Sequence, residues 1–421
     1  MAQICVIGAG VIGLSTAYYC TQRGHSVTVV DRLPPRRNGC SYGNAGMIVP
    51  SHFVPLAAPG MVALGLKWMW NPESPFYIRP RLDADLIAWA YRFWRAATPA
   101  HVRRSAPLLR DLSLASRQAF AEIADLPGHD FGLVRRGLLM LCQSEHALAE
   151  ESQTATRARE LGLPAEVLDA RQTAALDPGV TMDIQGAIYF PQDCHLAPDR
   201  FMGVLQKQLE DQGTRFLWET EVTGWRKEGT RLRAIQTRAG TAVGPEIDAD
   251  EFVLGGGSWS PGLGNTLGLN IPLQAGKGYS LTLTAPRELP QLCSILTEAR
   301  VAVTPMGKSL RVGGTMEIAG LNDKINPARV RGIVKSLTRY FPNFKESDFA
   351  GIEPWFGLRP CSPDGLPYLG RTTKYRNLIL ATGHAMMGLS LGPVTGQIVA
   401  QLLSDERPAY DLALLSPDRF G

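Results

Sequence analysis

The sequence predicts a mixed α/β protein in which a domain built on a parallel sheet is interleaved with an α+β domain built on an antiparallel sheet. Three observations lead to this fold. The chain opens with a strand, a glycine-rich turn, a helix and a second strand over residues 3–31. Alternating strand patterns separated by short turns recur between residues 214 and 320. A strand, a glycine-rich turn and a helix return over residues 377–404. A chain of 421 residues is long enough for two such domains.

The opening segment has the pattern of a dinucleotide-binding unit. "QICVI" is typical of a buried strand, "LSTAYYCTQRG" predicts a helix closed by Gly24, and "SVTVVD" predicts a strand ending at Asp31. The intervening turn reads GAGVIG over residues 8–13, and its glycines allow close approach to a pyrophosphate at the helix N-terminus. Asp31 stands 18 residues after the last of these glycines, where a carboxylate can bind a ribose. The segment therefore predicts a Rossmann-like unit.

The remaining elements follow in chain order. Residues 61–125 predict a helical insertion whose aromatic side chains form its core, with a membrane-touching surface as the alternative. Helices are also predicted from "PDRFMGVLQKQLEDQG" and "PARVRGIVKSLTRYFP". Strands are predicted from "LLMLC", "GAIYFP", the hairpins of residues 214–240, "DEFVL", "GYSLTLTA", "VAVTPM" and "SLRVGGTMEI".

These elements suggest that the chain crosses between the two domains several times. The dinucleotide-binding domain is expected to comprise residues 1–50, 151–180, 196–265 and 365–421. The second domain, with the helical insertion, is expected to bind the substrate and to comprise residues 51–150, 181–195 and 266–364.

Composition argues against several classes of protein. The formal charge of +4 arises from 43 basic and 39 acidic residues that are dispersed along the chain, which is too mild for a nucleic-acid partner. The small basic clusters "RLPPRR" and "HVRR" are expected to be solvated surface. Seven cysteines without a C-x-x-C pair indicate neither a disulfide framework nor a metal site. No signal peptide or apolar run of about 18 residues is evident, so we expect a cytoplasmic protein, or one peripheral to the inner face of the plasma membrane.

The C-terminal segment narrows the family. The strand "LILATG" is followed by His384 and by glycines that open a helix, which brings a second set of backbone amides toward an extended cofactor. With the N-terminal unit, this resembles the amine-oxidising flavoproteins related to D-amino-acid oxidase, glycine oxidase and sarcosine oxidase, in particular the bacterial D-amino-acid dehydrogenases and their hydroxyproline-oxidising branch. The resemblance rests on "VIGAGVIGLSTAYY", "SYGNAGMIVP", "AAPG", "KGYSLTL", "LRVGGTMEI", "GLRPCSPDGLPYLGRT" and "NLILATGHAMMGLSLG".

The resemblance implies a non-covalent FAD, because Cys361 is not at the offset of the cysteine that binds flavin covalently in sarcosine oxidases. The glycine turn would hold the pyrophosphate, Asp31 the adenosine ribose, the loop after Cys40 one side of the flavin ring, and the segment after Thr382 its other edge. The residues so assigned are Gly8, Gly10, Val11, Ile12, Gly13, Asp31, Arg32, Ser41, Asn44, Ala45, Gly46, Met47, Val222, Gly256, Gly383, His384, Met387 and Gly388.

The resemblance also assigns a substrate anchor. Arg359 in "GLRPCSPDG" would bind the substrate carboxylate, and a guanidinium fork suits that role because it donates two parallel hydrogen bonds. The alternative is a structural bridge from Arg359 to Asp364. Tyr279 would place a hydroxyl over the substrate, although a half-buried strand tyrosine is the simpler interpretation. His52 and His195 lie in loops expected to border the pocket.

The function implied is oxidative deamination of D-amino acids, including D-proline or cis-4-hydroxy-D-proline, by hydride transfer from the α-carbon to flavin N5. Electrons would then pass to a quinone or another acceptor. Three alternatives stay open: a glycine- or sarcosine-type oxidase that uses oxygen, an FAD-bearing subunit of a larger electron-transfer complex, and a NAD-binding regulatory protein. No metal is expected.

Overall fold

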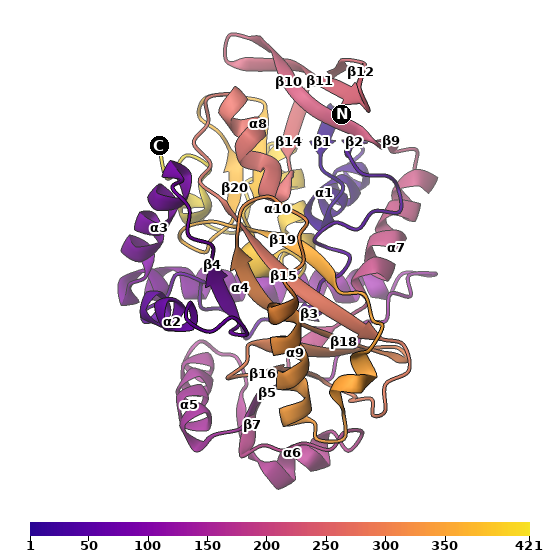
Figure 1. Ribbon diagram of the computed structural model, residues 1–421. Coiled ribbons are helices and arrows are strands. Elements are labelled where there is room, and N and C mark those ends of the chain that lie inside the picture. Colours follow the sequence, from indigo (N-terminus) through magenta and orange to yellow (C-terminus); the bar gives the residue numbers. More distant parts are fainter.

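A computed structural model describes all residues 1–421 and places them in two lobes, one above the other in Figure 1. The upper lobe is built on a six-stranded sheet whose strand order is β20-β21-β14-β1-β2-β9. All neighbours in this sheet are parallel except β20 and β21. Its strands are β1 (Gln3–Ile7), β2 (Ser26–Val30), β9 (Arg215–Leu217), β14 (Glu251–Leu254), β20 (Tyr368–Arg371) and β21 (Leu378–Thr382).

Alternate side chains of this sheet enter two different cores. Ile4 and Val6 of β1 pack with helices on one face, whereas Cys5 and Ile7 pack with a small second sheet on the other. The helices are α1 (Val11–Gln22), α4 (Pro99–Ala124), α7 (Pro198–Asp211) and α10 (Gly392–Leu403). The opposite face is covered by β10 (Thr220–Glu228), β11 (Arg231–Ala239), β12 (Ala242–Val243), β13 (Ile247–Asp248) and α8 (Ser260–Thr266).

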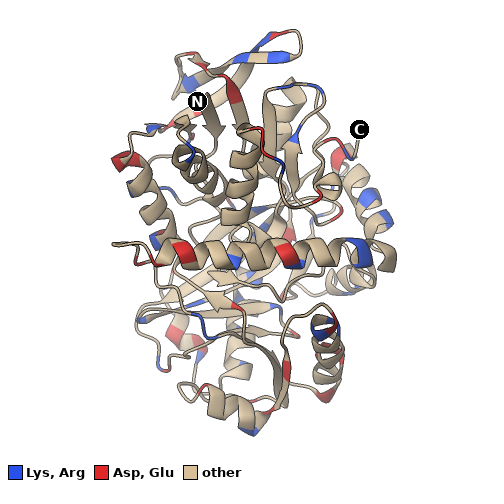
Figure 2. Cartoon of the chain, turned by 180° about the vertical axis from the view of Figure 1, so that it is seen from behind, with Lys and Arg blue, Asp and Glu red and all other residues tan.

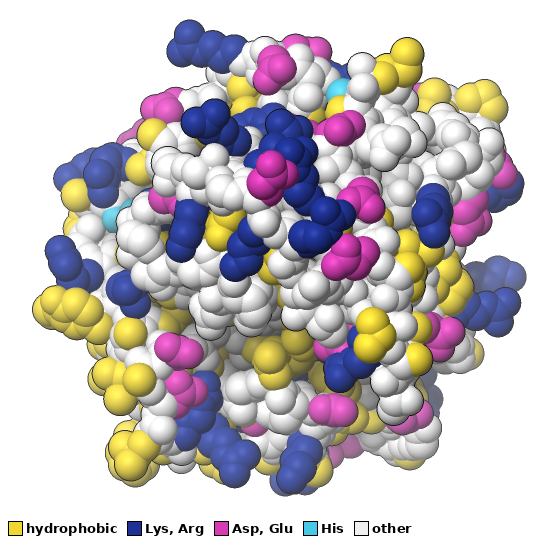
Figure 3. Space-filling view, turned by 90° about the horizontal axis from the view of Figure 1, so that it is seen from above, with side chains coloured by type: hydrophobic (Ala, Val, Ile, Leu, Met, Phe, Trp, Pro, Cys, Tyr) yellow, Lys and Arg dark blue, Asp and Glu magenta, His cyan; other side chains and the backbone are white.

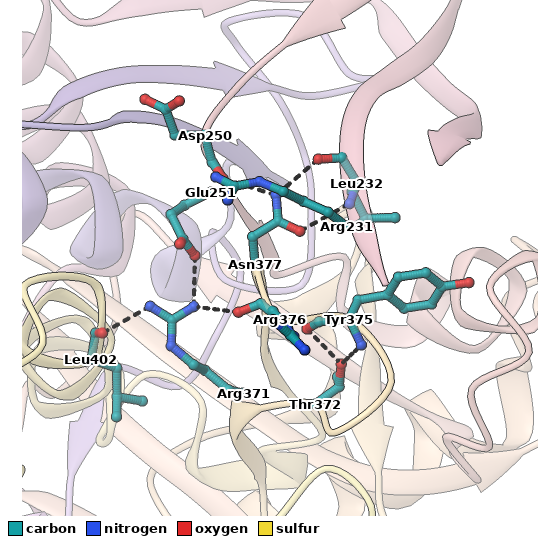
Figure 4. Close-up of polar contacts among 10 residues, drawn as sticks. All are labelled: Arg231, Leu232, Asp250, Glu251, Arg371, Thr372, Tyr375, Arg376, Asn377 and Leu402. Carbon is teal, nitrogen blue, oxygen red and sulfur yellow. Dashed lines mark hydrogen bonds and ion pairs between the residues drawn. The ribbon is translucent and has the colours of Figure 1, made fainter. Parts of the chain in front are cut away.

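A buried asparagine fastens this small sheet to the six-stranded one (Figure 4). The Asn377 amide nitrogen donates to the carbonyls of Leu232 (2.9 Å) and Asp250 (2.8 Å), and its amide oxygen accepts from the Leu232 N–H (2.9 Å). Beside it, Arg371 pairs with Glu251 at 2.7 Å and donates to the Leu402 carbonyl at the end of α10. The small sheet, the six-stranded sheet and helix α10 of the upper lobe are therefore joined by one polar cluster.

The lower lobe is built on a nine-stranded sheet with the order β19-β15-β18-β17-β16-β5-β7-β6, to which β4 adds beside β18. Helix α9 (Pro327–Tyr340) covers one face, and α5 (Glu145–Glu160) and α6 (Ala170–Leu176) lie near its far end (Figure 1). The strands are β4 (Phe76–Ile78), β5 (Leu138–Cys142), β6 (Glu166–Asp169), β7 (Gly186–Phe190), β15 (Gln274–Leu283), β16 (Cys293–Leu296), β17 (Val301–Met306), β18 (Ser309–Ile318) and β19 (Trp355–Cys361).

The predicted fold class is confirmed, but two domain boundaries need correction. Residues 151–180, assigned from sequence to the dinucleotide-binding domain, lie in the lower lobe, because β6 pairs with β7 in the nine-stranded sheet. Helix α4, assigned to the substrate-binding domain, packs Leu109, Leu112 and Phe120 into the same core as α1 and α10. Figure 2 shows α4 running across the molecule between the two lobes, with basic and acidic positions dispersed along the chain.

The helical insertion comprises α2 (Met61–Trp68), β4 and α3 (Ala84–Ala96). The expectation that its aromatic side chains form a core holds for Trp89, which is 3% exposed and donates to the Cys361 carbonyl at 2.9 Å. It is wrong for Trp70 and Trp94, which are 90% and 61% exposed. None of the helices is both long and apolar enough to cross a membrane.

Candidate active site

A cavity of about 520 Å³ lies at the carboxyl ends of β1, β2, β14 and β21, where ligands bind in open α/β sheets. The segment Leu358–Pro360 of β19 closes it from the lower lobe. Twelve residues predicted to bind the cofactor line this cavity: Gly8, Gly10, Val11, Ile12, Asp31, Arg32, Ser41, Asn44, Val222, Gly256, His384 and Gly388. Arg359 lines it as well, so the structure brings the predicted anchor and the predicted cofactor residues together.

The glycine turn between β1 and α1 forms one wall. Gly8 has a φ of +103°, and a Cβ there would lie 2.6 Å from the Gly255 carbonyl oxygen. A Cβ on Gly13 would lie 1.8 Å from the Gly8 carbonyl oxygen, so Gly13 permits the turn without lining the cavity. Gly10 is the N-cap of α1 and has no side chain to cap it, which leaves amides of the first turn for an anion.

The end of β2 forms a second wall. The Asp31 carboxylate accepts from the backbone N–H groups of Ala9 (2.6 Å) and Leu33 (2.8 Å), which fixes its orientation. The Arg32 guanidinium lies 3.8 Å from the centre of the Trp259 ring, and both residues line the cavity. Arg37 donates through Nε and Nη2 to the Ala9 carbonyl and is 6% exposed. The expectation that "RLPPRR" is solvated surface is therefore wrong for Arg37.

The loop after Cys40 crosses over the glycine turn. The Ser41 hydroxyl accepts from the Val11 N–H at 3.1 Å, and the Asn44 side chain accepts from the Gly46 N–H at 2.9 Å. Gly46 has a φ of +77°, and a Cβ there would lie 2.2 Å from the Leu196 carbonyl oxygen. Ala45, Gly46 and Met47 do not line the cavity. Met47 instead begins β3 (Met47–Ile48), which pairs with β8 (Cys194–His195).

The segment after β21 closes the cavity opposite this loop. His384 is buried, its Nε2 lies 3.0 Å from the Thr395 hydroxyl, and its Nδ1 has no partner within the protein. Burial lowers the pKa of His384 to about 3, so the ring is neutral at physiological pH. Gly383 and Met387 do not line the cavity. Gly383 packs instead on the Tyr368 ring, where a Cβ would approach to 2.8 Å.

Arg359 projects from β19 across Gly278 of β15. A Cβ on Gly278 would lie 2.3 Å from the guanidinium, so glycine leaves the space that the arginine needs. Its Nη1 donates to the Thr315 carbonyl at 2.6 Å, and no carboxylate of the protein forms a salt bridge with it. The alternative bridge to Asp364 does not form, because Asp364 pairs with Arg419 at 2.7 Å. Arg359 thus presents uncompensated charge at the cavity.

Neither member of the aromatic pair that precedes Arg359 lines this cavity. The Trp355 ring packs on Gly43 and Gly357, at each of which a Cβ would fall within 2.3 Å of it. Phe356 packs against the core beneath the nine-stranded sheet and lies 5.3 Å from the Lys277 ammonium. The residues that line the cavity next to Arg359 in β19 are Leu358 and Pro360.

Tyr279 does not reach the cavity, contrary to the expectation of a hydroxyl over the substrate. Its ring is 1% exposed in the core beside α9, and its hydroxyl donates to Glu317 at 2.7 Å and accepts from the Asn326 N–H at 3.2 Å. The physical reason is strand alternation: Gly278 faces Arg359, so the next residue faces the opposite side.

The two histidines predicted to border the pocket also lie outside the cavity lining. The Nδ1 of His52 contacts the Ser51 hydroxyl at 3.0 Å, and that hydroxyl donates to Asp193. His195 pairs through its backbone with Met47 and is 1% exposed. Burial lowers the pKa of both histidines to about 4. Both rings are therefore neutral parts of the structure that supports the loop after Cys40.

Comparison with known families decides which dinucleotide this cavity serves. A family described as FAD dependent oxidoreductase matches residues 3–402. The chain belongs to the FAD-dependent oxidoreductases. It is therefore a flavoenzyme, as the resemblance implied.

Two full-length relatives of this oxidoreductase carry the name D-amino acid dehydrogenase. The protein from Bradyrhizobium diazoefficiens is 33% identical, with 100% of this chain and 99% of the relative covered, and that from Granulibacter bethesdensis is 32% identical with complete coverage of both. Among solved structures, glycine oxidase from Geobacillus kaustophilus superposes with a TM-score of 0.77 at 23% identity, covering 100% of both chains. An L-proline dehydrogenase from P. horikoshii gives 0.76 at 17% identity, covering 100% of this chain and 97% of the other. These two likenesses concern the fold.

The cavity of the oxidoreductase fits FAD by two observations. The turn at Gly8 packs on Gly255 too closely for a Cβ, and it leads into the N-terminus of α1, where Ser41 accepts from the Val11 N–H and the amides that follow stay available to a pyrophosphate. At the other end, the buried Nδ1 of His384 is without a hydrogen-bond partner in the protein, as expected of a group that faces a polar ligand. No group of three or more His, Cys, Asp or Glu side chains is arranged to hold a metal ion.

Sequence reasoning missed several residues of this site. Trp259 and Arg37 line the cavity, but neither lies in a glycine turn or a strand pattern. The only sequence signal for Trp259 was its place two residues after the glycines that follow β14. Gly278 was quoted within "KGYSLTL" without a role, although it makes the space for Arg359.

Proposed function

We propose that this oxidoreductase catalyses the oxidative deamination of D-amino acids, as a dehydrogenase. One observation carries the proposal: Arg359 lines the same cavity as the glycine turn between β1 and α1, and no carboxylate of the protein neutralises the Arg359 charge. The names of the full-length relatives support the same substrate class.

In this proposal Arg359 binds the substrate carboxylate. A guanidinium has five N–H donors, and only Nη1 is engaged, with the Thr315 carbonyl, so two parallel donors stay available for a carboxylate. A guanidinium is an always-charged partner for a carboxylate, and Leu358 and Pro360 line the cavity next to it. Holding the carboxylate limits the orientations of the substrate, so that its single α-hydrogen can be directed at the cofactor.

FAD, held by the glycine turn, Asp31, Arg32 and His384, supplies the hydride acceptor when bound. The substrate leaves as an imino acid, which water hydrolyses to a 2-oxo acid and ammonia. The amine must be neutral to lose a hydride. No acidic side chain lines the cavity near Arg359 to hold it as an ammonium, since Asp31 and Glu221 lie with the adenosine-binding residues. The electrons then pass to a quinone or another carrier.

Replacement of the anchor tests the proposal. Arg359→Met should lower kcat/KM for D-amino acids by about two to three orders of magnitude, because a desolvated carboxylate loses its partner. The bound flavin should be retained, and Arg359→Lys should recover part of the activity. Arg407→Met, which changes an exposed arginine in the segment after α10, is the matched control. Near-normal kcat/KM in Arg359→Met would show that the carboxylate binds elsewhere.

The substrate class is tested separately by anaerobic bleaching of the flavin with a panel of amino acids. D-amino acids should bleach it and their L-enantiomers should not. D-proline and cis-4-hydroxy-D-proline test cyclic substrates, and glycine and sarcosine test the alternative oxidase. Rapid reoxidation by air would favour that oxidase, whereas slow reoxidation by air and fast reoxidation by a quinone would favour a dehydrogenase.

A further inference from the structure

Strand β18 carries one extra residue where it passes the Arg359 side chain. The pairs that β15 and β18 form on the two sides of this point are regular: Lys277 with Glu317, and Tyr279 with Gly314. Between them a single residue of β15, Gly278, lies opposite two residues of β18, Thr315 and Met316. This arrangement is a β-bulge, a feature that is frequent beside active sites and that changes the direction of nearby side chains.

Thr315 has a backbone conformation that is rare for its residue type. Its φ is +70°, in the left-handed region, where a β-branched residue is an outlier. Bulges that need a left-handed residue commonly use glycine, and two glycines directly precede Thr315 without occupying this position. Such strain persists only where the surrounding structure maintains it, and it is concentrated at functional sites. The conformation of Thr315 therefore indicates a role for the bulge.

The strands on the other edge of β18 hold the bulge in place. There β18 pairs with β17 as far as Gly314 and with β4 from Met316 onward. The Met316 N–H also donates to the Pro75 carbonyl at 2.8 Å. Thr315 alone has no paired residue in β15, β17 or β4. Its carbonyl is therefore available to a side chain.

The Arg359 side chain extends across β15 to reach this carbonyl. In the backbone ladder Arg359 pairs with Gly276, and the strand order is β19-β15-β18. Its guanidinium lies against Gly278, where a Cβ would approach to 2.3 Å. Its Nη1 donates to the Thr315 carbonyl at 2.6 Å. The guanidinium therefore contacts both strands of the bulge.

The bulge holds Arg359 without neutralising it. On the face of the molecule seen in Figure 3, Lys and Arg side chains lie at the surface with Asp and Glu side chains among them. Arg359 instead is half-buried, forms no salt bridge and is held by a backbone carbonyl of β18. A carbonyl fixes the orientation of a guanidinium and leaves its positive charge available to a bound anion.

We propose that this bulge orients the Arg359 guanidinium toward the substrate carboxylate, with Gly278 and Thr315 as positioning residues. The inference rests on the proposed function, because it takes Arg359 as the anchor. A guanidinium that is already held in one orientation loses less conformational freedom when a carboxylate binds, which increases affinity. The contribution of Thr315 comes from its backbone, so the length of β18 at this point should matter more than the side chain of Thr315.

Deletion of Thr315 tests the proposal, because it removes the extra residue and lets the pairs on both sides of the bulge keep their register. The probe is propionate, a carboxylate without an amine, titrated into the flavin-loaded protein and followed by the flavin absorbance. The dissociation constant should rise at least about tenfold in the deletion variant and in Gly278→Ala, with the flavin content of the parent. Thr315→Gly keeps the bulge and relieves its strain, so it should retain propionate binding and raise the thermal unfolding midpoint.

Gly224→Ala is the matched control for Gly278→Ala. Gly224 also lies in a strand beside an irregularity of the ladder, but a Cβ there would meet the exposed Gln236 side chain, at 2.6 Å, in place of Arg359. Its affinity for propionate should equal that of the parent. If the deletion variant does not fold, the comparison of Gly278→Ala with Gly224→Ala decides the question.

Arg359→Met separates this inference from the proposed function. If the parent does not bind propionate, or Arg359→Met binds it equally well, the anchor is wrong and both proposals fail. If Arg359→Met loses binding while the deletion variant and Gly278→Ala keep it, the orienting role of the bulge alone is overturned. A loss in Thr315→Gly as large as in the deletion variant would assign the effect to the Thr315 side chain and contradict the role of its backbone.

Discussion

Gly8 is held in a backbone conformation that side chains rarely adopt, with its Cα against the Gly255 carbonyl. Gly8→Ala adds the strain of a positive φ, about 1–2 kcal/mol, and a methyl group 2.6 Å from that oxygen. The turn must move away from β14, which also moves the amides that face the pyrophosphate. We expect the flavin content of the purified protein to fall at least about tenfold, as measured by the ratio of flavin to protein absorbance.

Gly213 offers a control for the strain alone. It also has a positive φ, +82°, but a Cβ there would meet nothing within 4 Å. Gly213→Ala should cost about 1–2 kcal/mol of stability and leave the flavin bound. Equal flavin content in Gly8→Ala and Gly213→Ala would contradict the role of the Gly8 turn.

The direction of single side chains was the hardest feature to predict. Strand β15 is buried along almost its whole length, so its pattern of apolar residues does not reveal which side faces the cavity. Tyr279 was therefore expected near the substrate, whereas the preceding residue, Gly278, is the one that lies against the guanidinium of Arg359. The burial of Arg37 was not predicted for a related reason: its partners are the carbonyls of Ala9 and Pro35 and the distant Gln206 side chain, which no sequence pattern indicates.

At the scale of elements, Asn377 holds the β10–β11 hairpin to the six-stranded sheet through three hydrogen bonds. Asn377→Ala leaves the buried N–H and carbonyl of Leu232 without partners, which should cost about 2–4 kcal/mol. Val222, on the same hairpin, lines the cavity. We therefore expect a lower thermal unfolding midpoint together with weaker retention of FAD.

Asn270 provides the comparison for this element. It is exposed and makes a single hydrogen bond, to the Phe420 carbonyl. Asn270→Ala should change stability by less than about 0.5 kcal/mol and leave flavin retention unaltered. If Asn377→Ala behaves in the same way, the polar cluster of Figure 4 does not fasten the hairpin.

Sequence patterns identified most helices and strands, but not the strands or cores with which each of them pairs or packs. The strand "LLMLC" and the helix "PDRFMGVLQKQLEDQG" were found because apolar periodicity is local. The short strand β6 carries little buried surface, and only its pairing with β7 assigns it to the lower lobe. Helix α4 was assigned to the wrong domain for the same reason. Its periodicity indicates an apolar face, but it does not indicate which core that face packs against, because the core is formed by residues distant in the sequence.

At the scale of the whole molecule, stability should depend on the protonation of a buried carboxyl group. Asp193 is 1% exposed, and burial raises its pKa to about 7 despite hydrogen bonds from Ser51 and the positive charge of Arg117. The unfolded chain has the ordinary value near 3.8. Between these two values the folded protein holds a proton that the unfolded chain releases. The stability contributed by this group is therefore complete below the lower value and is lost as the pH rises to about 7.

Asp193→Asn isolates this contribution, because an amide resembles the protonated acid. The stability of the parent relative to the variant should fall with rising pH at up to about 1.4 kcal/mol per pH unit. Above pH 7 it should level off, once the native carboxyl has also ionised. The buried histidines His52, His195 and His384 act in the opposite sense, since their lowered pKa values make stability rise between about pH 4 and 6.5. They are present in both proteins and cancel in the difference.

Thermal unfolding midpoints of the flavin-loaded proteins between about pH 5 and 8 measure that difference. Ser51→Ala keeps the carboxyl group and loses one of its donors, so it should retain the pH-dependent part. Ser51 also contacts His52, and the strand before it, Met47–Ile48, pairs with β8, which directly follows Asp193. Ionisation of Asp193 would therefore loosen the loop that crosses over the glycine turn. Flavin retention should therefore decline over the same pH range in the parent and stay level in Asp193→Asn, and parallel curves for the two proteins would exclude Asp193 as the group responsible.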